Sequence, residues 1–155
     1  MLRVGDLAPD FTATTSHGNQ LTLSALRGRR VVLFFFPKAF TTGCTIETRR
    51  FRDHYAEIAA LGAEVIGVSV DKEQTQCDFA SQEGVPYPMI GDESRAINRS
   101  YDVLWPLLGV SQRVTYIIGP DGKIERVLHH ELLVHKHLDE VKRHLQSLPR
   151  SASGT

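Results

Sequence analysis

Six consecutive apolar residues, VVLFFF at 31–36, stop at Pro37, and this run constrains the fold more than any other part of the chain. An all-apolar strand is typical of a sheet that is covered on both faces. Proline ends such a strand because it cannot donate a ladder hydrogen bond. After Pro37 a Thr-Thr-Gly turn leads to Cys44, and apolar residues then follow a helical period as far as Leu61. The run therefore predicts a buried strand, a short loop and a helix that begins at a cysteine.

Short strands and helices alternate through the rest of the sequence. Residues 11–14 and 20–23, on either side of a Ser-His-Gly-Asn turn, predict an N-terminal hairpin. Asp71, with Gln74 three residues later, has the spacing of a capping box at a helix start. The other predicted elements are strands at 64–70, 87–90, 114–118 and 124–128 and helices at 93–101 and 134–148. A βαβ unit followed by a ββα unit predicts an α/β fold, with a central mixed β-sheet flanked by helices.

Length and charge exclude several functional classes. With 155 residues, the chain can bury one core, and we expect a single domain over 1–148 with a flexible polar tail at 149–155. Its 18 basic and 18 acidic residues balance, which argues against a nucleic-acid or membrane-surface role. The N-terminal residues lack the apolar segment of an export signal, so we expect a cytoplasmic protein. Two cysteines in such a chain favour catalysis or redox sensing over a structural disulfide.

Cys44 stands where a helix activates a thiol. The first turn of a helix has unpaired N–H groups and a partial positive charge, which favour a thiolate over a thiol. Cys44 also lies seven residues before Phe51, so helical periodicity places it on the core-facing stripe. The plainer alternative is a small buried hydrophobe, the usual fate of a free cysteine. The position predicts an activated nucleophile inside a pocket at the end of the sheet.

The spacing around this cysteine resembles a known active-site loop. Pro37-x-x-x-Thr41-x-x-Cys44 is similar to the peroxidatic loop of peroxiredoxins, and the continuation through Thr45 to Glu47 is most similar to the bacterioferritin comigratory protein branch, also called Q-type. The resemblance covers nearly the whole chain, up to about residue 148. It implies a thioredoxin-like fold and a thioredoxin-dependent thiol peroxidase that uses no metal, haem or flavin.

The run RVTYIIGPDGKI, which begins at Arg113, resembles the arginine strand and hairpin of the same family. One position departs from the family pattern, because Ala39 and Phe40 stand where this branch more often has a polar pair. Phe40 is expected to make the mouth of the pocket more apolar, which bears on the preferred peroxide.

The resemblance implies a role for each site residue. Cys44 attacks the peroxide, while Thr41 orients it and Pro37 shields the thiolate from water. Arg113 lowers the energy of the thiolate and donates to the peroxide, and Glu47 holds Arg113 in a bidentate pair. Each residue also has a plainer explanation: a helix cap for Thr41, a strand end for Pro37, a surface arginine for Arg113 and a first-turn acid for Glu47.

Cys77 falls in the helix predicted after Asp71, about 200° around from Phe79, and we expect it to face solvent. In this family branch the resolving cysteine, where present, lies five residues after the peroxidatic one or on this later helix. Position 49 is Arg49, so the resemblance points to Cys77 as the resolving cysteine. However, Cys77 is offset by about one helical turn from the family position.

Three other functions stay open. A one-cysteine peroxidase would leave Cys77 incidental and resolve Cys44 with an external thiol. A disulfide oxidoreductase on the same fold would show Cys-x-x-Cys, and here Thr41 occupies the partner position. A peroxide sensor or holdase would bind another protein when oxidised. The expected partners of the favoured enzyme are a peroxide and thioredoxin or a similar dithiol, and the expected assembly is a monomer or weak homodimer.

The peroxidase interpretation does not account for two features of the sequence. Four histidines cluster near the end of the predicted hairpin, at His129, His130, His135 and His137. No acid–histidine spacing there matches a metal site, so we expect a polar surface. An apolar loop with Trp105, Leu107 and Leu108 precedes Arg113 and is expected either to line the pocket or to meet another subunit.

Overall fold

The computed structural model describes residues 1–148, so the predicted tail at 149–155 lies outside the described residues. Five strands form one sheet in the order β5-β4-β3-β6-β7. Their bounds are β3 Arg30–Phe35, β4 Ala63–Ser69, β5 Met89–Gly91, β6 Val114–Ile118 and β7 Ile124–His129. β3 runs parallel to β4, and β4 to β5, whereas β6 is antiparallel to both β3 and β7. The predicted mixed sheet is confirmed.

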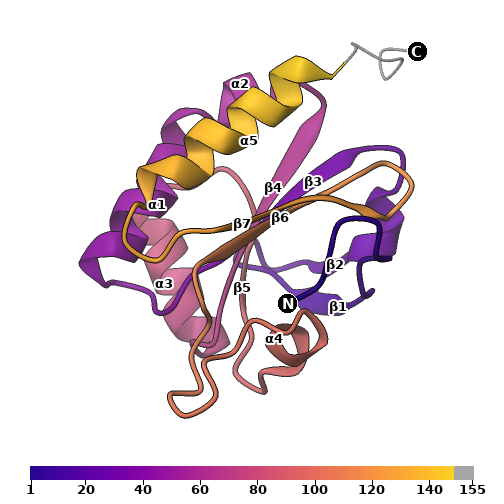
Figure 1. The fold of residues 1–155 in the computed structure, drawn as a ribbon. Coiled ribbons are helices and arrows are strands. Elements are labelled where there is room, and N and C mark those ends of the chain that lie inside the picture. The colour runs from indigo at the N-terminus through magenta and orange to yellow at the C-terminus, as the bar shows by residue number, and fades with distance from the viewer. Residues whose placement is uncertain (149–155) are drawn as a thin grey trace.

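Helices cover one face of this sheet, and a smaller layer covers the other (Figure 1). The first layer consists of α1 Thr42–Asp53, α2 Tyr55–Ala60, α3 Glu73–Glu83 and α5 His135–Ser147. The opposite layer consists of the N-terminal segment, the hairpin of β1 Thr12–Thr14 and β2 Gln20–Thr22, the 3-10 helix η1 Leu23–Leu26 and the short helix α4 Ala96–Ser100. The predicted N-terminal hairpin is therefore present, and it packs on the face away from α1.

The all-apolar run of β3 is buried on both faces, as predicted. Val32, Phe34 and Phe36 belong to the core under α1, α3 and α5, while the alternate residues of the strand belong to the core under α4. Phe34 stacks on Phe51 of α1 with ring centroids 4.7 Å apart. Such aromatic contacts add to the hydrophobic burial, so α1 is fixed firmly to the centre of the sheet.

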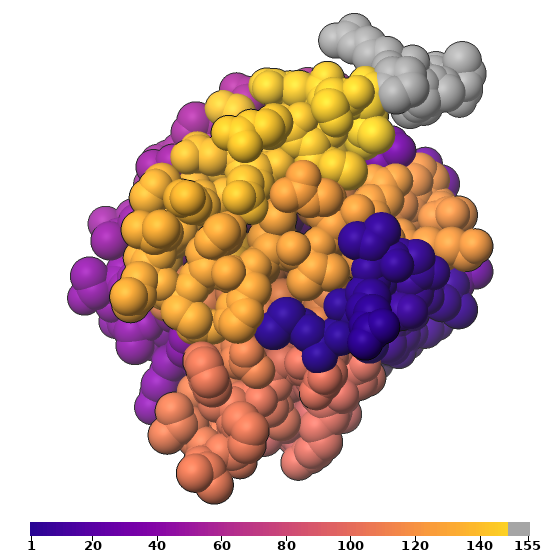
Figure 2. Space-filling view, in the orientation of Figure 1, coloured from indigo at the N-terminus to yellow at the C-terminus, as the bar shows by residue number. Residues whose placement is uncertain are grey.

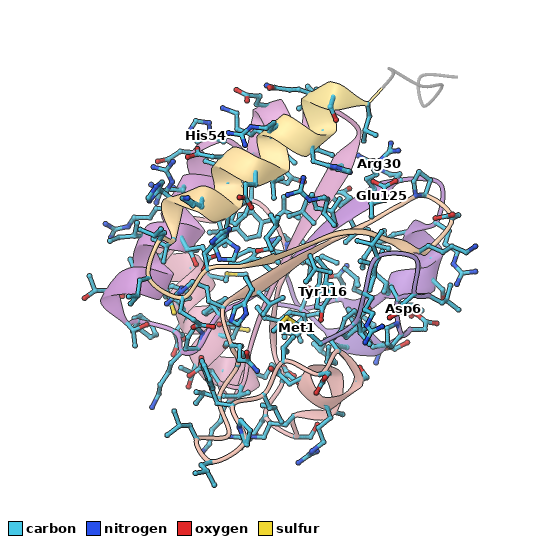
Figure 3. All side chains as sticks on the ribbon, viewed as in Figure 1. Met1, Asp6, Arg30, His54, Tyr116 and Glu125 are labelled. Carbon is cyan, nitrogen blue, oxygen red and sulfur yellow. The ribbon has the colours of Figure 1, made fainter. Side chains whose placement is uncertain are left out.

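The predicted helix 44–61 is instead two helices. α1 begins at Thr42, two residues earlier than expected, and ends at Asp53. His54, with φ −110° and ψ 9°, separates it from α2. Apolar periodicity continues across the break, since Phe51 and Ile58 are both fully buried, and periodicity alone does not reveal it. His54 lies at the side of the molecule where α1 and α2 meet (Figure 3).

The predicted capping box at Asp71 is wrong. α3 begins at Glu73 with Lys72 as the N-cap residue, and no side chain caps it. The Asp71 carboxylate accepts a hydrogen bond from the Ala39 backbone N–H at 2.7 Å and another from the Ser69 hydroxyl at 2.6 Å. Asp71 thus ties the loop after β3 to the end of β4. This contact joins two strand ends that are far apart in sequence.

Two further elements differ from the prediction in length. The strand expected at 87–90 is β5, Met89–Gly91, and the Tyr87 side chain is instead buried in the core. The helix expected at 93–101 is only α4, because Asp92 accepts hydrogen bonds from the backbone N–H groups of Ile97 and Asn98 and so starts the helix late. α5 and the hairpin of β6 and β7 agree with the prediction to within one residue at each end.

The centre of the surface seen in Figure 2 is formed by α5 (yellow), the β6–β7 region (orange) and the N-terminal segment (indigo). Met1 and Tyr116 lie close together in Figure 3, and the Tyr116 hydroxyl accepts from the Leu2 backbone N–H at 3.2 Å. Arg30 and Glu125 form an ion pair of 3.0 Å at the opposite end of the sheet (Figure 3). Within residues 1–148, no helix combines the length and apolarity that a membrane crossing requires.

Candidate active site

Cys44 is the third residue of α1 and is fully buried. The first helical hydrogen bond runs from the Thr45 N–H to the Thr41 carbonyl at 2.9 Å, so the N–H groups before Thr45 precede the helical ladder. The predicted core-facing placement is confirmed, because Cys44 belongs to the same core cluster as Phe51. The Cys44 sulfur thus lies at the positive end of a helix dipole, inside the protein.

The loop between β3 and α1 shapes the approach to this sulfur. Thr41 is the N-cap residue of α1, but its hydroxyl donates to the Lys38 carbonyl at 2.7 Å and does not cap the helix. Pro37 is half-buried directly after the strand. Phe40 adopts φ 66°, and its ring meets Phe79 of α3 edge-on with centroids 5.1 Å apart. With 47% of its surface exposed, Phe40 adds an apolar side chain beside the loop, as expected.

Arg113 reaches the site from the residue before β6. Its Nη1 lies 3.6 Å from the Cys44 sulfur and 2.9 Å from Oε1 of Glu47. The Arg113 backbone N–H and Nε donate to the side chain and carbonyl of Glu131, at 2.9 and 3.1 Å. Burial disfavours the guanidinium charge, but Glu47 and Cys44 outweigh it and raise the pKa of Arg113. The arginine is therefore a fixed positive charge beside the thiol.

Gly43 leaves room for this arginine. A Cβ at position 43 would lie 3.1 Å from the Arg113 Nη2 atom, a closer approach than carbon and nitrogen normally make. The choice of residue at position 43, directly before Cys44, is therefore limited by Arg113, which lies 70 positions away in the sequence. The glycine allows the guanidinium to lie directly against the first turn of α1.

Glu47 pairs with Arg113, but not in the expected bidentate way. Only Oε1 contacts the guanidinium, and Oε2 is buried without a hydrogen-bond partner among the described residues. Burial raises the pKa of Glu47 to about 7, although Arg113 acts in the opposite direction. The residue is therefore close to its titration point at neutral pH, whereas an exposed first-turn acid would be ionised.

His137 is a part of this region that sequence reasoning missed. It was expected on a polar surface with the other histidines, but it is fully buried, with Nδ1 3.7 Å from Glu47 Oε2. Burial lowers the pKa of His137 to about 4, so its ring is neutral. The signal lay in the helical period, because His137, Val141 and Leu145 repeat every four residues on the buried side of α5.

The other three histidines agree better with the expected polar surface. His129 and His130 are partly exposed and contact Glu131 and Glu140, at 2.6 and 3.0 Å. His135 is exposed at the start of α5. Over the described part of the chain, no three His, Cys, Asp or Glu side chains gather closely enough to hold a metal ion.

Cys77 lies in α3, apart from the other site residues. It is a free thiol and half-buried, so it is less exposed than expected. Burial, Glu73 and Asp78 raise its pKa above the ordinary value. Two residues along, Phe79 carries the aromatic contact with Phe40 of the active-site loop. α3 therefore contacts the loop that leads into α1 and the buried Cys44.

Two arginines join α1 to α3 beyond the first turn. Arg49 donates to both carboxylate oxygens of Glu83, at 2.5 and 3.5 Å, and Glu83 is almost completely buried. Arg52 donates to the Glu83 carbonyl at 2.8 Å. These bonds fix the later turns of α1 to the end of α3, whereas the turn with Cys44 is held by Arg113.

The apolar loop before β6 extends away from the body of the molecule (Figure 1). Leu107 and Leu108 are 97% and 72% exposed, and Trp105 is half-buried. Neither exposed leucine belongs to the two core clusters. The expectation that this loop lines the pocket or meets another subunit stays a prediction.

Comparison with known proteins shows the family to which the chain belongs. The sequence profile described as the AhpC/TSA family matches residues 4–127. The chain is 34% identical over 144 residues to chloroplastic peroxiredoxin Q of Gentiana triflora, a match that covers 92% of this chain and 66% of the relative. It is 32% identical to peroxiredoxin Bcp of Escherichia coli K12, over 86% of this chain and 94% of the relative. The chain belongs to the AhpC/TSA family, in its peroxiredoxin Q/Bcp branch.

Solved structures of the same branch have the same fold. The peroxidoxin BcpB of Mycobacterium tuberculosis superimposes with a TM-score of 0.89 and 32% identity, over 96% of this chain and 99% of that one. The bacterioferritin comigratory protein of Xanthomonas campestris gives 0.81 and 29%, over 88% and 90%. The thioredoxin-like fold is confirmed, and this peroxiredoxin is by its family an enzyme, an oxidoreductase of the thiol peroxidase class.

Proposed function

We propose that this peroxiredoxin reduces hydrogen peroxide and organic hydroperoxides through Cys44. The observation that carries the proposal is the buried Cys44 sulfur at the start of α1 with the Arg113 guanidinium 3.6 Å away. A positive charge and a helix N-terminus together favour the thiolate, which is the nucleophilic form. The same pair can also orient the peroxide and stabilise charge on the leaving oxygen.

The reaction follows from these groups. The thiolate sulfur attacks one peroxide oxygen, the O–O bond breaks, and the other oxygen takes a proton and leaves as water or an alcohol. Cys44 becomes a sulfenic acid, so sulfur is oxidised by two electrons and the peroxide is reduced by two. Thr41 lies beside the cysteine at the N-cap, where its hydroxyl can turn from the Lys38 carbonyl to the substrate. Pro37 limits access of water.

The resolving step uses Cys77. Its thiolate attacks the Cys44 sulfenic acid, the S–O bond breaks, and water leaves as the disulfide forms. Thioredoxin or a similar dithiol then reduces the disulfide. The Phe40–Phe79 contact supports this assignment because it joins the Cys44 loop to α3 near Cys77. A disulfide needs Cα atoms within about 7 Å. Because Cys44 is fully buried at the start of α1 and Cys77 lies partly exposed on another helix, α3, we expect the turn with Cys44 to open first.

The raised pKa of Cys77 favours one rival function. A thiol that ionises less readily attacks sulfenic acid more slowly, and an external thiol would then resolve Cys44. In that one-cysteine peroxidase Cys77 has no catalytic role. The Xanthomonas relative is described as having alkyl peroxide reduction activity, which is consistent with either scheme. The cytoplasmic location and the monomeric or weakly dimeric state remain predictions.

Replacing Cys44 tests the peroxidase proposal. Cys44→Ser keeps the size of the side chain but removes the nucleophile, so consumption of hydrogen peroxide with a thioredoxin system should fall to the background rate. Cys77→Ser is the matched control and should retain the first peroxide turnover, followed by stopped-flow mixing. Substantial turnover in Cys44→Ser would remove Cys44 from the reaction.

Replacing Cys77 separates the two schemes. Wild type given one equivalent of peroxide should lose both free thiols and yield a Cys44–Cys77 peptide on digestion. Cys77→Ser should stop at sulfenic acid and advance to sulfinic acid as peroxide increases. If Cys77 in wild type remains open to alkylation after turnover, the one-cysteine scheme takes the place of the intramolecular one.

A further inference from the structure

The segment between β7 and α5, residues 130–134, contacts Arg113 through Glu131. The Glu131 carboxylate accepts a hydrogen bond from the Arg113 backbone N–H at 2.9 Å, and the Glu131 carbonyl accepts another from Nε of the guanidinium at 3.1 Å. One residue thus holds both the backbone and the side chain of Arg113. The peroxidase scheme described above gives Glu131 no role.

Burial of apolar side chains does little to place this segment. Leu132 and Leu133 are 91% and 49% exposed, so the segment does not gain its position from them. Val134 is half-buried, and its Cγ1 atom lies 4.0 Å from the position that a Cβ on Gly43 would take. The contacts that place the segment beside the first turn of α1 are therefore those of Val134 and Glu131.

The Glu131 carboxylate is itself oriented by a neighbouring ring. Nε2 of His129 lies 2.6 Å from Oε2 of Glu131, the same oxygen that accepts from the Arg113 N–H. A carboxylate oxygen has two lone pairs, so it can accept from both donors at once. Both side chains are partly exposed, so shortening Glu131 opens no buried cavity. Two partners therefore keep this carboxylate directed at the start of β6.

These contacts leave the guanidinium of Arg113 little freedom. Its Nε is bound to the Glu131 carbonyl, and its Nη1 is bound to Oε1 of Glu47 at 2.9 Å. The same Nη1 lies 3.6 Å from the Cys44 sulfur. Because a guanidinium is planar and rigid, fixing Nε and Nη1 fixes the direction of the whole group. With Glu47 as its only partner, the group would be free to pivot about Nη1.

We propose that Glu131 is a positioning residue of the peroxidase site. Its carboxylate fixes the start of β6, its carbonyl fixes Nε of Arg113, and together they direct Nη1 at the Cys44 sulfur. Glu131 acts only through hydrogen bonds to Arg113 and does not touch the peroxide. The effect on rate rests on the proposed peroxidase function, whereas the hydrogen bonds themselves are measured without peroxide.

The second-order reaction of Cys44 with hydrogen peroxide measures the effect on rate. Glu131→Ala removes the acceptor for the Arg113 N–H and should slow the reaction roughly tenfold, the factor that corresponds to one lost hydrogen bond. Glu131→Gln keeps an acceptor oxygen of the same reach and should recover most of the rate. Glu140→Ala is the matched control, because Glu140 is a partly exposed acid of α5 that pairs with His130.

A double-mutant cycle with Arg113→Ala separates positioning from a merely structural role. If Glu131 acts through Arg113, adding Glu131→Ala to Arg113→Ala should change the rate by less than about twofold, because the group that Glu131 positions is gone. A double variant that is slower by the full additional factor would overturn the proposal. A folded Glu131→Ala with the wild-type rate, or a Glu131→Gln as slow as Glu131→Ala, would do the same.

Hydrogen exchange followed by NMR is the readout without peroxide. In the reduced protein, Glu131→Ala should speed exchange of the Arg113 backbone N–H and Nε–H roughly tenfold, and Glu131→Gln should preserve their protection. If circular dichroism shows that Glu131→Ala does not fold, Glu131→Asp replaces it in both experiments, because its carboxylate is one methylene too short for the contact. Unchanged exchange would contradict the positioning role, whereas a chain that reduced no peroxide but showed these changes would defeat only the proposed function.

Discussion

The two cysteines differ in how deeply each thiol is buried and in which polar groups lie near it. Cys44 is fully buried at the start of a helix, with a guanidinium, a carboxyl and an imidazole in successive contact behind it. Cys77 is half-buried in the middle of α3, and only acidic neighbours, Glu73 and Asp78, act on its thiol. In the proposed scheme, the surroundings of Cys44 are arranged before substrate arrives, whereas Cys77 would react only after a rearrangement that brings the Cys44 sulfenic acid within reach.

The largest expected difference between the two regions follows from Arg113. Loss of an electrostatic stabiliser of this kind typically costs ~10²–10³ in rate. Arg113→Ala should therefore slow second-order peroxide reduction by that factor while circular dichroism shows a folded protein. Arg126→Ala is the control, because Arg126 forms only a partly exposed pair with Glu140. A folded Arg113→Ala variant with the wild-type rate would show that the Arg113 charge does not accelerate the reaction of Cys44 with peroxide.

The second expected difference is in how stability depends on pH. Glu47 has its pKa raised from 4.5 to about 7, so its contribution is full below about pH 4.5 and is lost as pH rises toward 7. His137 has its pKa lowered from 6.5 to about 4, so its contribution is full above pH 6.5 and is lost as pH falls. The two slopes oppose each other between about pH 4.5 and 6.5, and wild type should show little net change there from this pair.

Glu47→Gln should reveal the pH dependence of stability that comes from His137 alone. With only His137 titrating, the free energy of unfolding of Glu47→Gln should fall by about 1.4 kcal/mol per pH unit as pH decreases from 6.5 to 4.5, the range over which wild type changes little. Urea denaturation at several pH values measures it. Glu73→Gln, beside Cys77, should run parallel to wild type. If the Glu47→Gln curve is also parallel, the two titrations do not oppose each other in the buried pair.

The smallest effect is expected beside Cys77. Glu73 raises the pKa of the Cys77 thiol, but the thiol is only half-buried and solvent screens the charge. Glu73→Gln should therefore speed disulfide formation by no more than about threefold, a range typical of an exposed charge pair. Stopped-flow measurement of the second phase after peroxide addition would detect it. A tenfold or larger change would mean that the Glu73 charge acts on the Cys77 thiol more strongly than the structure indicates.

Sequence reasoning succeeded where the determinants are close together in the chain. The strand at 31–36, its stop at Pro37 and the helix with Cys44 all depend on neighbouring residues, and the family resemblance added Arg113 and Glu47. The contacts of Asp71 and His137 were missed because each lies against a segment far away in sequence. Asp71 has the spacing of a capping box, yet tertiary contact with Ala39 determines its conformation. His137 looks like one of four surface histidines until the buried side of α5 is known.

The division of the long helix at His54, with the arginine bonds to Glu83, limits how far local unfolding can spread. α2 has its own first turn after the break, and Arg49 and Arg52 hold the later part of α1 to α3. If the turn around Cys44 opens as proposed, we therefore expect the cooperative unit to be confined to the first one or two turns of α1. Backbone amides in that unit should exchange with solvent at a lower free energy than those of α2 and of the central strands. The protein could then expose the Cys44 sulfur while most of the hydrophobic core stays protected.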